Sequence, residues 1–205
     1  MKLGGDQSKI APVTVAGIRI NLRNNMKKIE TEFPGLVIIE PEVYGDDRGF
    51  FYETFNAKKM AALGIDHAWD QDSHSASVKG VLRGLHFQLP PETQVKMVRC
   101  IKGKVWNVVV DMRKDSPTYK KWYGIELSPE NKKMLYIPEG FANGFHVLED
   151  CEYVYKVSKT YSPDHDANVK FDDPAFGIDW KLDGEPTLSG RDQAAPSFDQ
   201  LELPF

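Results

Sequence analysis

The chain has 205 residues, 41% of them hydrophobic, and a formal net charge of −4. This length is enough for one domain with a substantial core. The negative charge argues against a nucleic-acid-binding protein, so any phosphate must be met by a local cluster of cations. The sequence contains no apolar run near the ~20 residues of a membrane helix and no recognisable signal peptide, so we expect a cytoplasmic protein without membrane contact.

The two cysteines, Cys100 and Cys151, fall in separate strand-like segments. They lack the Cys-x-x-Cys spacing of a zinc knuckle or a redox pair. We expect both to be reduced and structural, as is usual in the cytosol, with a disulfide between them as the alternative.

Residues 1–25 show no clear periodicity, and Met26 opens a segment that reads like a natural start. We expect 1–25 to be a leader segment and 26–205 to be a single domain. The alternative is an added N-terminal strand at Val13–Ile20, where β-branched residues are frequent.

From Leu36 onward, short apolar segments alternate with turn residues, a pattern typical of all-β folds. One short helix is expected at Ala57–Leu63, capped by Asn56 and closed by Gly64. Turns are expected at Lys102-Gly103 and at 128–131. The expected strands are 36–40, 50–55, 68–75, 78–88, 95–101, 104–112, 120–127, 134–137, 144–148 and 152–160. Past Tyr161 we expect a loop-rich tail wrapped on a jelly-roll β-sandwich or barrel, whose two sheets enclose a pocket.

The segment Gly80–Gln88 places one cation and one imidazole among apolar residues. Arg83 and His86 are three residues apart, so they would face opposite sides of a regular strand. Gly84 between them is typical of a β-bulge, which would turn both side chains toward one cavity. A partly exposed histidine on an ordinary strand is the alternative.

Further polar side chains that fall on neighbouring strands or in the tail are Lys96, Arg99, Asn143, Tyr153, Tyr155 and Asp192. Taken singly, each could be an exposed or packing residue. Together, without a serine or cysteine nucleophile motif, they suit proton transfer at carbon. His86 could remove a proton beside a carbonyl, a cation could stabilise the enolate oxygen, and a phenol could return a proton to the other face. A carboxylate bonded to the imidazole would fix its tautomer.

A metal site is the rival interpretation for a jelly roll. The segment His86-Phe87-Gln88 holds one histidine, and Asn143 stands where a ligand histidine is usual. His146 comes three residues later and is expected on the opposite face of its strand. Three or four good ligands are not visible, so we expect no metal.

Several segments carry a resemblance to a known family: Gly45–Thr54, Gln71–Ser75, Val78–Gln88, Lys96–Cys100, Ile137–Phe145 and Phe176–Trp180. Together they resemble the dTDP-4-dehydrorhamnose 3,5-epimerase family, over roughly residues 35–195. The resemblance implies a cupin-type jelly roll, usually a homodimer, that needs no metal or other cofactor. The implied activity converts dTDP-4-dehydro-6-deoxy-D-glucose into dTDP-4-dehydro-L-rhamnose by inverting C3 and C5 through an enolate, in rhamnose and polysaccharide biosynthesis.

The resemblance also implies residue roles. His86 matches the base, Asp192 its partner, Tyr155 the proton donor, and Lys96 the residue beside the enolate oxygen. The positions implied to bind the nucleotide sugar are Arg48, Glu53, Gln71, Asp72, Ser73, Arg83, Asn143 and Arg191.

Asn143 is a departure, because the family generally has histidine in this motif, and Ser73 is a milder one in place of asparagine. Asparagine can still donate or accept a hydrogen bond but does not titrate. Alternatives therefore stay open: an epimerase that acts at C3 or C5 alone, a sugar-binding jelly roll without activity, or a metal-dependent cupin.

Overall fold

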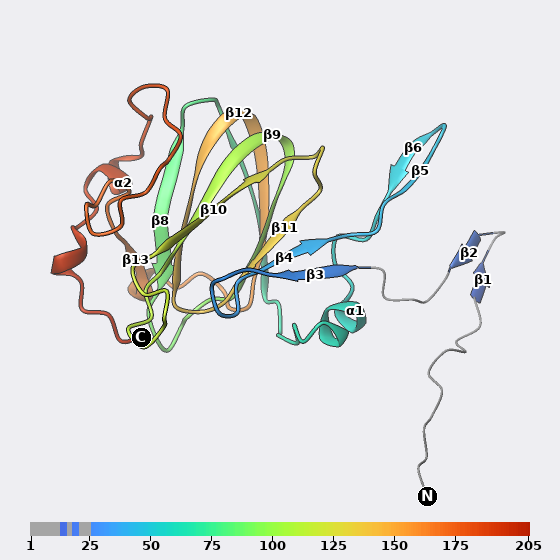
Figure 1. The fold of residues 1–205 in the computed structure, drawn as a ribbon, viewed down its shortest axis with the longest axis horizontal. Coiled ribbons are helices and arrows are strands. Elements are labelled where there is room, and N and C mark those ends of the chain that lie inside the picture. Colours follow the sequence, from blue (N-terminus) through green and yellow to red (C-terminus); the bar gives the residue numbers. More distant parts are fainter. Residues whose placement is uncertain (1–12, 16–17, 21–25) are drawn as a thin grey trace, which may run out of the picture.

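The computed structural model describes residues 13–15, 18–20 and 26–205, and most of the ordered secondary structure is antiparallel strand (Figure 1). The expected all-β fold with few short helices is confirmed. The strands are β1 (Val13–Val15), β2 (Ile18–Ile20), β3 (Lys27–Glu30), β4 (Val37–Glu40), β5 (Tyr44–Asp46), β6 (Gly49–Phe51), β7 (Gln71–Ser77), β8 (Leu82–Gln88), β9 (Lys96–Asp111), β10 (Trp122–Leu127), β11 (Met134–Ile137), β12 (Phe141–Val157) and β13 (Asp166–Asn168). The helices are α1 (Ala57–Ala62), α2 (Gly190–Gln193) and the 3-10 turns η1 (Pro163–His165) and η2 (Phe198–Gln200).

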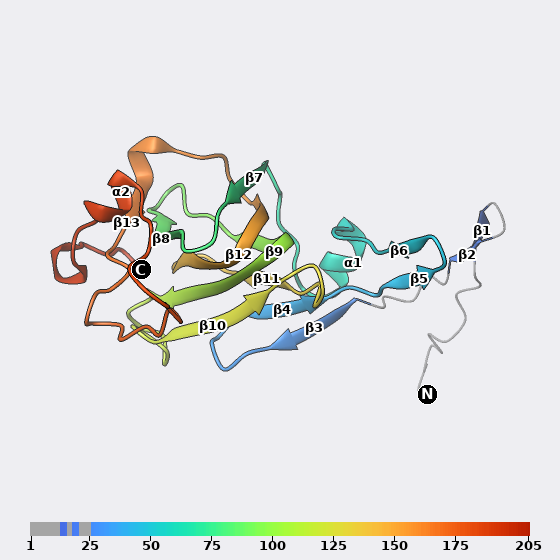
Figure 2. The same cartoon turned by 90° about the horizontal axis from the view of Figure 1, so that it is seen from above.

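Two long strands, β9 and β12, build both layers of the sandwich (Figure 2). The first half of β9 pairs with the second half of β12, and β7, β11, β4 and β3 extend this layer. The second half of β9 pairs with the first half of β12, and β10, β8 and β13 extend the other layer. A pocket between the layers is therefore walled by strands that are far apart in sequence.

The turn expected at Lys102-Gly103 is wrong, because β9 bends at these residues and does not end there. The strand continues through these residues, and the two strands expected at 95–101 and 104–112 are one. Gly103 has φ +68°, and a Cβ atom there would lie 2.0 Å from the Asp150 carbonyl oxygen. Opposite it, β12 shifts register between Val147 and Tyr153, so its two expected strands are also one. Glycine at 103 thus lets two strands bend together from one layer into the other.

Other expectations hold within a few residues. Asn56 caps α1, because its side-chain oxygen accepts a hydrogen bond from the Lys59 backbone N–H at 3.2 Å. The segment Val13–Ile20 contains two short paired strands rather than one. The other residues of 1–25 lie outside the described part of the chain. The leader segment expected at 1–25 therefore stays a prediction.

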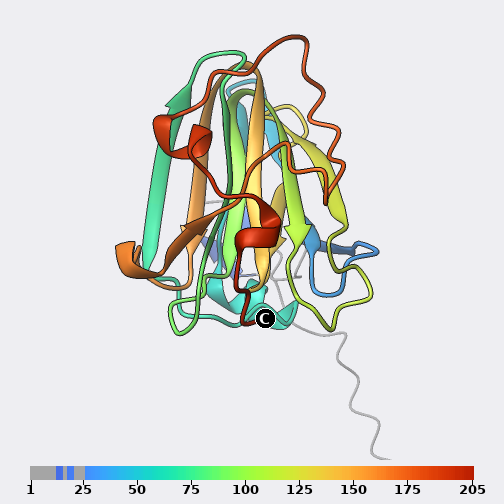
Figure 3. The same ribbon diagram turned by 90° about the vertical axis from the view of Figure 1, so that its left-hand side faces the viewer.

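The apolar residues fill three regions. One cluster, including Val98, Val105 and Phe145, lies between the layers. A second joins β8 to the C-terminal tail through residues such as Leu85 and Trp180. The tail crosses the outer face of the β8 layer, as expected (Figure 3). The third cluster lies beneath α1.

A hairpin of β5 and β6 projects from the body of the sandwich (Figure 1; Figure 2). We call residues 44–51 the arm. Its Phe50 and Phe51 side chains are 63% and 66% exposed. Among the described residues, no helix is long and apolar enough to cross a membrane.

Candidate active site

The bulge expected in β8 is present and brings Arg83 and His86 to one cavity. His86 pairs with Asn143 while Arg83 pairs with Phe145, so three steps along β8 match two along β12. Gly84 has φ +128°, and a Cβ atom there would lie 2.5 Å from the Gly144 Cα. Because only glycine fits this conformation and this close approach, the bulge depends on Gly84.

The cavity has a volume of about 240 Å³ and lies between the two layers. One wall, from β8 and β12, carries the polar side chains of Arg83, His86 and Asn143. The other wall, from β7, β9 and β12, carries those of Ser75, Lys96, Tyr153 and Tyr155. A base, an amine and phenols therefore converge on one space, which suits proton transfer to and from a bound molecule.

His86 is paired with a buried carboxylate from the tail. Its Nε2 lies 2.5 Å from Asp192 Oδ1, and the Asp192 side chain is 2% exposed. The Ser189 hydroxyl donates to Asp192 Oδ2 at 2.8 Å and accepts from the Asp192 backbone N–H at 3.1 Å. Burial alone would raise the pKa of Asp192, but hydrogen bonds from His86 and Ser189 outweigh it and lower that pKa. An ionised Asp192 holds the ring with its other nitrogen, Nδ1, as the one left to take a proton.

Lys96 lies on the opposite wall, at the start of β9. Burial lowers its pKa to about 8, an effect that Asp166 opposes and Arg191 reinforces. A half-buried ammonium interacts more strongly with an anion formed in the cavity than a fully solvated one would. The prediction that Lys96 stands beside an enolate oxygen is consistent with this position.

The two tyrosines of β12 differ in what they can do. Tyr153 is 1% exposed, its hydroxyl donates to Asn107 Oδ1 at 2.6 Å, and burial raises its pKa well above the usual value. Tyr155 lines the same cavity and is half-buried, and no hydrogen bond occupies its hydroxyl among the described residues. The hydroxyl of Tyr155 is therefore available to a bound molecule, whereas that of Tyr153 is engaged, and the role of Tyr155 as proton donor stays a prediction.

Three predicted binding residues make hydrogen bonds within or next to β7. Arg83 borders the His86 cavity, and Ser73 borders a second cavity described below. Arg83 donates to Ser77 Oγ at 3.0 Å and to the Ala76 carbonyl at 3.2 Å. Gln71 donates to Ser73 Oγ at 3.0 Å and accepts from the Tyr161 backbone N–H at 2.8 Å.

The predicted Arg191, whose charge acts on Lys96, is held by an acidic residue that the sequence did not indicate. Arg191 pairs with Asp166 at 2.8 Å, and the Tyr161 hydroxyl donates to the same carboxylate at 3.0 Å. Asp166, Tyr161 and Ser189 lie in the tail, where no periodic pattern indicates which side chains turn inward. The Ser189-x-x-Asp192 spacing, typical of a helix start, is the one signal that could have found Ser189.

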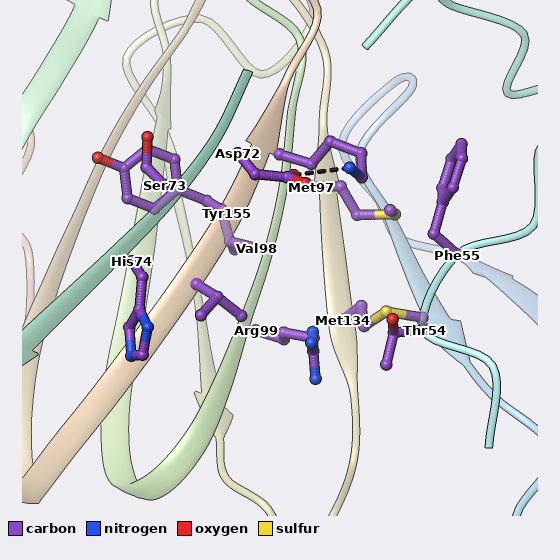
Figure 4. A pocket seen from close by; sticks show the side chains of 12 residues that line it. Thr54, Phe55, Asp72, Ser73, His74, Met97, Val98, Arg99, Met134 and Tyr155 are labelled. Atoms are coloured by element: carbon purple, nitrogen blue, oxygen red, sulfur yellow. Dashed lines mark hydrogen bonds and ion pairs between the residues drawn. The ribbon is translucent and has the colours of Figure 1, made fainter. Parts of the chain in front are cut away.

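Asp72 lies on the opposite face of the sheet from His86. It alternates with Gln71 and Ser73 along β7 and pairs with Lys156 at 2.6 Å. This outer face holds a second cavity of about 320 Å³, shown in Figure 4, with Phe55, Met97, Arg99 and Met134 around it. Within one chain, Asp72 and Arg99 therefore border this outer cavity and not the one that His86 lines.

Arg48 and Glu53 also lie away from His86 within one chain. Arg48 is at the turn of the arm, its side chain is 88% exposed, and it pairs with Asp46. Glu53 follows the arm and pairs with Lys59 of α1 at 2.5 Å. Neither residue borders the His86 cavity.

No group of three or more His, Cys, Asp or Glu side chains is placed to hold a metal ion in the part of the chain that the structure describes. His146 is turned from the cavity, as expected, and its Nδ1 lies 3.1 Å from the Trp180 carbonyl oxygen. Cys100 and Cys151 are both buried and free, in agreement with the expectation of reduced cysteines.

Comparison with known proteins connects this geometry with one family. The family model described as dTDP-4-dehydrorhamnose 3,5-epimerase matches residues 30–200. A dTDP-4-dehydrorhamnose 3,5-epimerase from Salmonella typhimurium is 48% identical over 177 residues, which cover 85% of this chain and 97% of the relative.

Solved structures give the same result. A 3,5-epimerase from Legionella pneumophila, in complex with dTDP-4-keto-L-rhamnose, superposes with a TM-score of 0.83 at 45% identity, covering 86% of this chain and 95% of that one. A 3'-monoepimerase from Streptomyces bikiniensis, in complex with dTDP-quinovose, has a TM-score of 0.77 at 34% identity, covering 82% and 86%. The chain thus belongs to the dTDP-4-dehydrorhamnose 3,5-epimerase family, and its activity is the epimerisation for which that family is named.

Proposed function

We propose that the protein epimerises a dTDP-linked 4-keto-6-deoxyhexose at C3 and C5, with His86 as the base. The observation that carries this proposal is the His86–Asp192 pair, which faces Lys96 and Tyr155 across a single cavity. No described cluster of metal ligands accompanies it, and acid–base chemistry uses the side chains that are present.

In the proposed reaction His86 removes the proton from a carbon beside the C4 ketone. The electron pair moves to the ketone oxygen, and the Lys96 ammonium stabilises the resulting enolate. Tyr155 then donates its proton to the opposite face of that carbon, which inverts the configuration. Afterwards the His86 imidazolium releases its proton to solvent, and Tyr155 regains one from solvent. Asp192 stabilises the imidazolium that forms, because its carboxylate stays ionised.

The number of inverted carbons is the finer question. Relatives from Salmonella typhimurium and Shigella flexneri, both named 3,5-epimerases, are 48% and 50% identical to the chain, against 34% for the 3'-monoepimerase. These identities support inversion at both C3 and C5.

The test is deuterium uptake in heavy water with dTDP-4-keto-6-deoxyglucose as substrate, with label positions determined by NMR. We expect label at both C3 and C5 of the product. Label at one carbon would make the protein a single-centre epimerase, and no label would contradict the proposal.

We also propose a homodimer in which the arm of one copy reaches the active site of the other. Arg48 and Glu53 match substrate-binding positions, yet Arg48 lies on the arm, which projects from the sandwich (Figure 1), Glu53 follows it, and neither borders the His86 cavity of its own chain. Two neighbouring exposed phenylalanines, Phe50 and Phe51, are unusual in a monomer, because exposing large apolar side chains to water is unfavourable. The outer cavity is bordered by the half-buried Phe55, an apolar side chain that a second copy could cover.

Complementation tests this arrangement. Arg48→Ala and His86→Asn chains, each inactive as homodimers, are co-expressed with different tags, and the mixed dimer is purified. We expect activity in the mixed dimer, because one cavity then receives an intact His86 and an intact Arg48. An inactive mixed dimer would place Arg48 in the active site of its own chain or outside the mechanism.

The remaining assignments concern the residues that bind the nucleotide diphosphate. We propose that Arg83, Arg191, Gln71 and Ser73 bind the nucleotide diphosphate portion, since arginine forks suit phosphate oxygens. Asp72 would reach the ligand only from the outer face. The two free, buried cysteines support a reducing, cytoplasmic location.

A further inference from the structure

Three uncharged polar side chains near His86 have no part in the proposed proton transfers. Asn143 stands directly opposite His86 in the pairing of β12 with β8. Asn107, on β9, is opposite Phe145 and fully buried. Tyr153 comes from the other layer, and its hydroxyl joins the group by donating to Asn107 Oδ1 at 2.6 Å. We call these residues the amide–phenol group.

Two atoms of this group are orphaned. Among the described residues, the buried side-chain nitrogen and oxygen atoms without a hydrogen-bond partner are Asn107 Nδ2 and Asn143 Oδ1. A buried acceptor left unpaired costs about 1–3 kcal/mol. Asn143 lines the cavity, so a bound molecule can supply the missing partner there.

The same phenol connects both amides. Burial raises the pKa of Tyr153, and its interaction with the Asn143 amide opposes that rise. Because Tyr153 has a single proton and gives it to Asn107, it offers its own oxygen lone pairs toward Asn143 as an acceptor. The terminal torsion of an asparagine is broad, so its amide can present oxygen to a ligand while its nitrogen turns to the phenol.

We propose that Asn143 is a specificity-determining residue that binds a ring hydroxyl of the sugar, on or next to the carbon from which His86 removes the proton, and that Tyr153 and Asn107 are positioning residues for its amide. This inference rests on the proposed function. It predicts that the protein prefers 4-ketohexoses that keep both the C2 and the C3 hydroxyl to analogues that lack one of them. A site that bonds a hydroxyl rejects a deoxy analogue strongly, because the buried polar group then stays unpaired.

A purely structural role makes a different prediction. Tyr153 stacks on Phe145 with ring centroids 4.3 Å apart, and it belongs to the core between the layers. If the amide–phenol group only supported packing, its variants would lower stability and leave the preference between substrates unchanged. The preference between hydroxylated and deoxy substrates is therefore the informative quantity.

The experiment measures kcat/KM for deuterium exchange at C5, a step common to dTDP-4-keto-6-deoxyglucose and its 2-deoxy and 3-deoxy analogues, because the 3-deoxy sugar has no configuration at C3 to invert. For the wild-type protein, we expect one analogue to react about 10- to 100-fold less efficiently than the parent sugar, the loss of one hydrogen bond to a buried group. We call this ratio of kcat/KM values, parent sugar over analogue, the penalty. In Asn143→Ala the penalty should fall below about threefold, because the mutant has already lost the hydrogen bond to the hydroxyl. Asn143→Asp keeps an acceptor of the same shape, and the penalty should return.

Tyr153→Phe tests the positioning step, and Tyr123→Phe is the matched control. Tyr123 is a half-buried tyrosine packed against the same core, but it does not border the His86 cavity. We expect Tyr153→Phe to reduce the penalty and Tyr123→Phe to leave it at the wild-type value. The temperature of unfolding of each variant separates this effect from a loss of folded protein.

The outcomes distinguish the inference from the proposed function. An unchanged penalty in Asn143→Ala, or equal use of all three sugars by the wild-type protein, would overturn the inference while leaving the epimerase activity intact. Failure of the wild-type protein to incorporate deuterium into the parent sugar would instead refute the proposed function. If Asn143→Ala is unstable, Asn143→Leu replaces it, because leucine keeps a side chain of similar size but has no acceptor, and calorimetry of the reaction product and its deoxy analogue makes the same comparison without turnover.

Discussion

Lys96 is a half-buried amine, and in the proposed mechanism its ionisation limits the reaction at alkaline pH. Its pKa is lowered to about 8, chiefly by burial. The ammonium form stabilises the enolate, so the useful form prevails below pH 8 and is lost as the pH rises through this value. We predict an alkaline fall in kcat/KM centred near this pKa. Lys96→Arg should move the fall to higher pH, because a guanidinium stays protonated. Rate profiles that coincide for the two proteins would remove Lys96 from the enolate step.

In the proposed mechanism Asp192 orients His86 and stabilises its charged form without carrying the proton itself. Replacement of His86 by Asn should lower kcat by about 10²–10⁴-fold, the usual contribution of a general base. Asp192→Asn should lower it by a smaller factor, because the imidazole remains but loses its ionised partner. Both values are measured under saturating substrate. A wild-type rate in Asp192→Asn would show that the tail has no role in catalysis.

The bulge in β8 is the element that places His86. Gly84→Ala should destabilise the protein by about 2–4 kcal/mol, since the added methyl meets the Gly144 backbone and the backbone conformation is unfavourable for alanine. Gly80→Ala is the control: it also has a positive φ, +84°, but nothing lies within 4 Å of its added Cβ. Its cost should be only about 1–2 kcal/mol. Denaturant unfolding compares the two, and an equal cost would mean that the close approach to β12 is unimportant.

At the scale of elements, the sequence predicted local features and missed the bends. Gly84 between Arg83 and His86 indicated the bulge, because a glycine within a strand is typical of a bulge or of a close approach between backbones. Gly103 indicated a turn, since glycine is frequent there, but here it bends a continuous strand. Periodicity reports which residues alternate, and it does not report whether a chain reverses or passes into another sheet. That choice depends on the pairing of β9 with β12, which is a long-range property.

The residues of the candidate site also divide into those on strands, which the sequence predicted, and those in the tail, which it mostly missed. His86, Lys96 and Tyr155 lie on strands, and the structure brings them to one cavity. Ser189 and Asp166 lie in the tail, whose path is set by packing against β8 rather than by any local pattern. Asp72 was grouped with the other binding residues, but strand alternation turns it to the outer face.

At the scale of the whole molecule, the arm is the feature that one chain does not explain. We predict that Phe50→Asp together with Phe51→Asp weakens association of the protein, because two buried charges would replace apolar contacts. Val78→Asp is the matched control, since Val78 is also 63% exposed but lies outside the arm. Sedimentation or light scattering at several concentrations gives the oligomeric state. A monomeric wild-type protein, or equal effects of the two changes, would contradict the proposed role of the arm.

The two walls of the cavity correspond to the two proposed proton transfers, in which His86 removes a proton on one face and Tyr155 returns one on the other. The most direct measurement is deuterium exchange into recovered substrate, alongside inversion, for His86→Asn and Tyr155→Phe. We predict that His86→Asn shows neither exchange nor inversion. Tyr155→Phe should still exchange, because His86 can remove and return protons on its own face, but it should not invert. Exchange that persists in His86→Asn, or full inversion by Tyr155→Phe, would contradict the account.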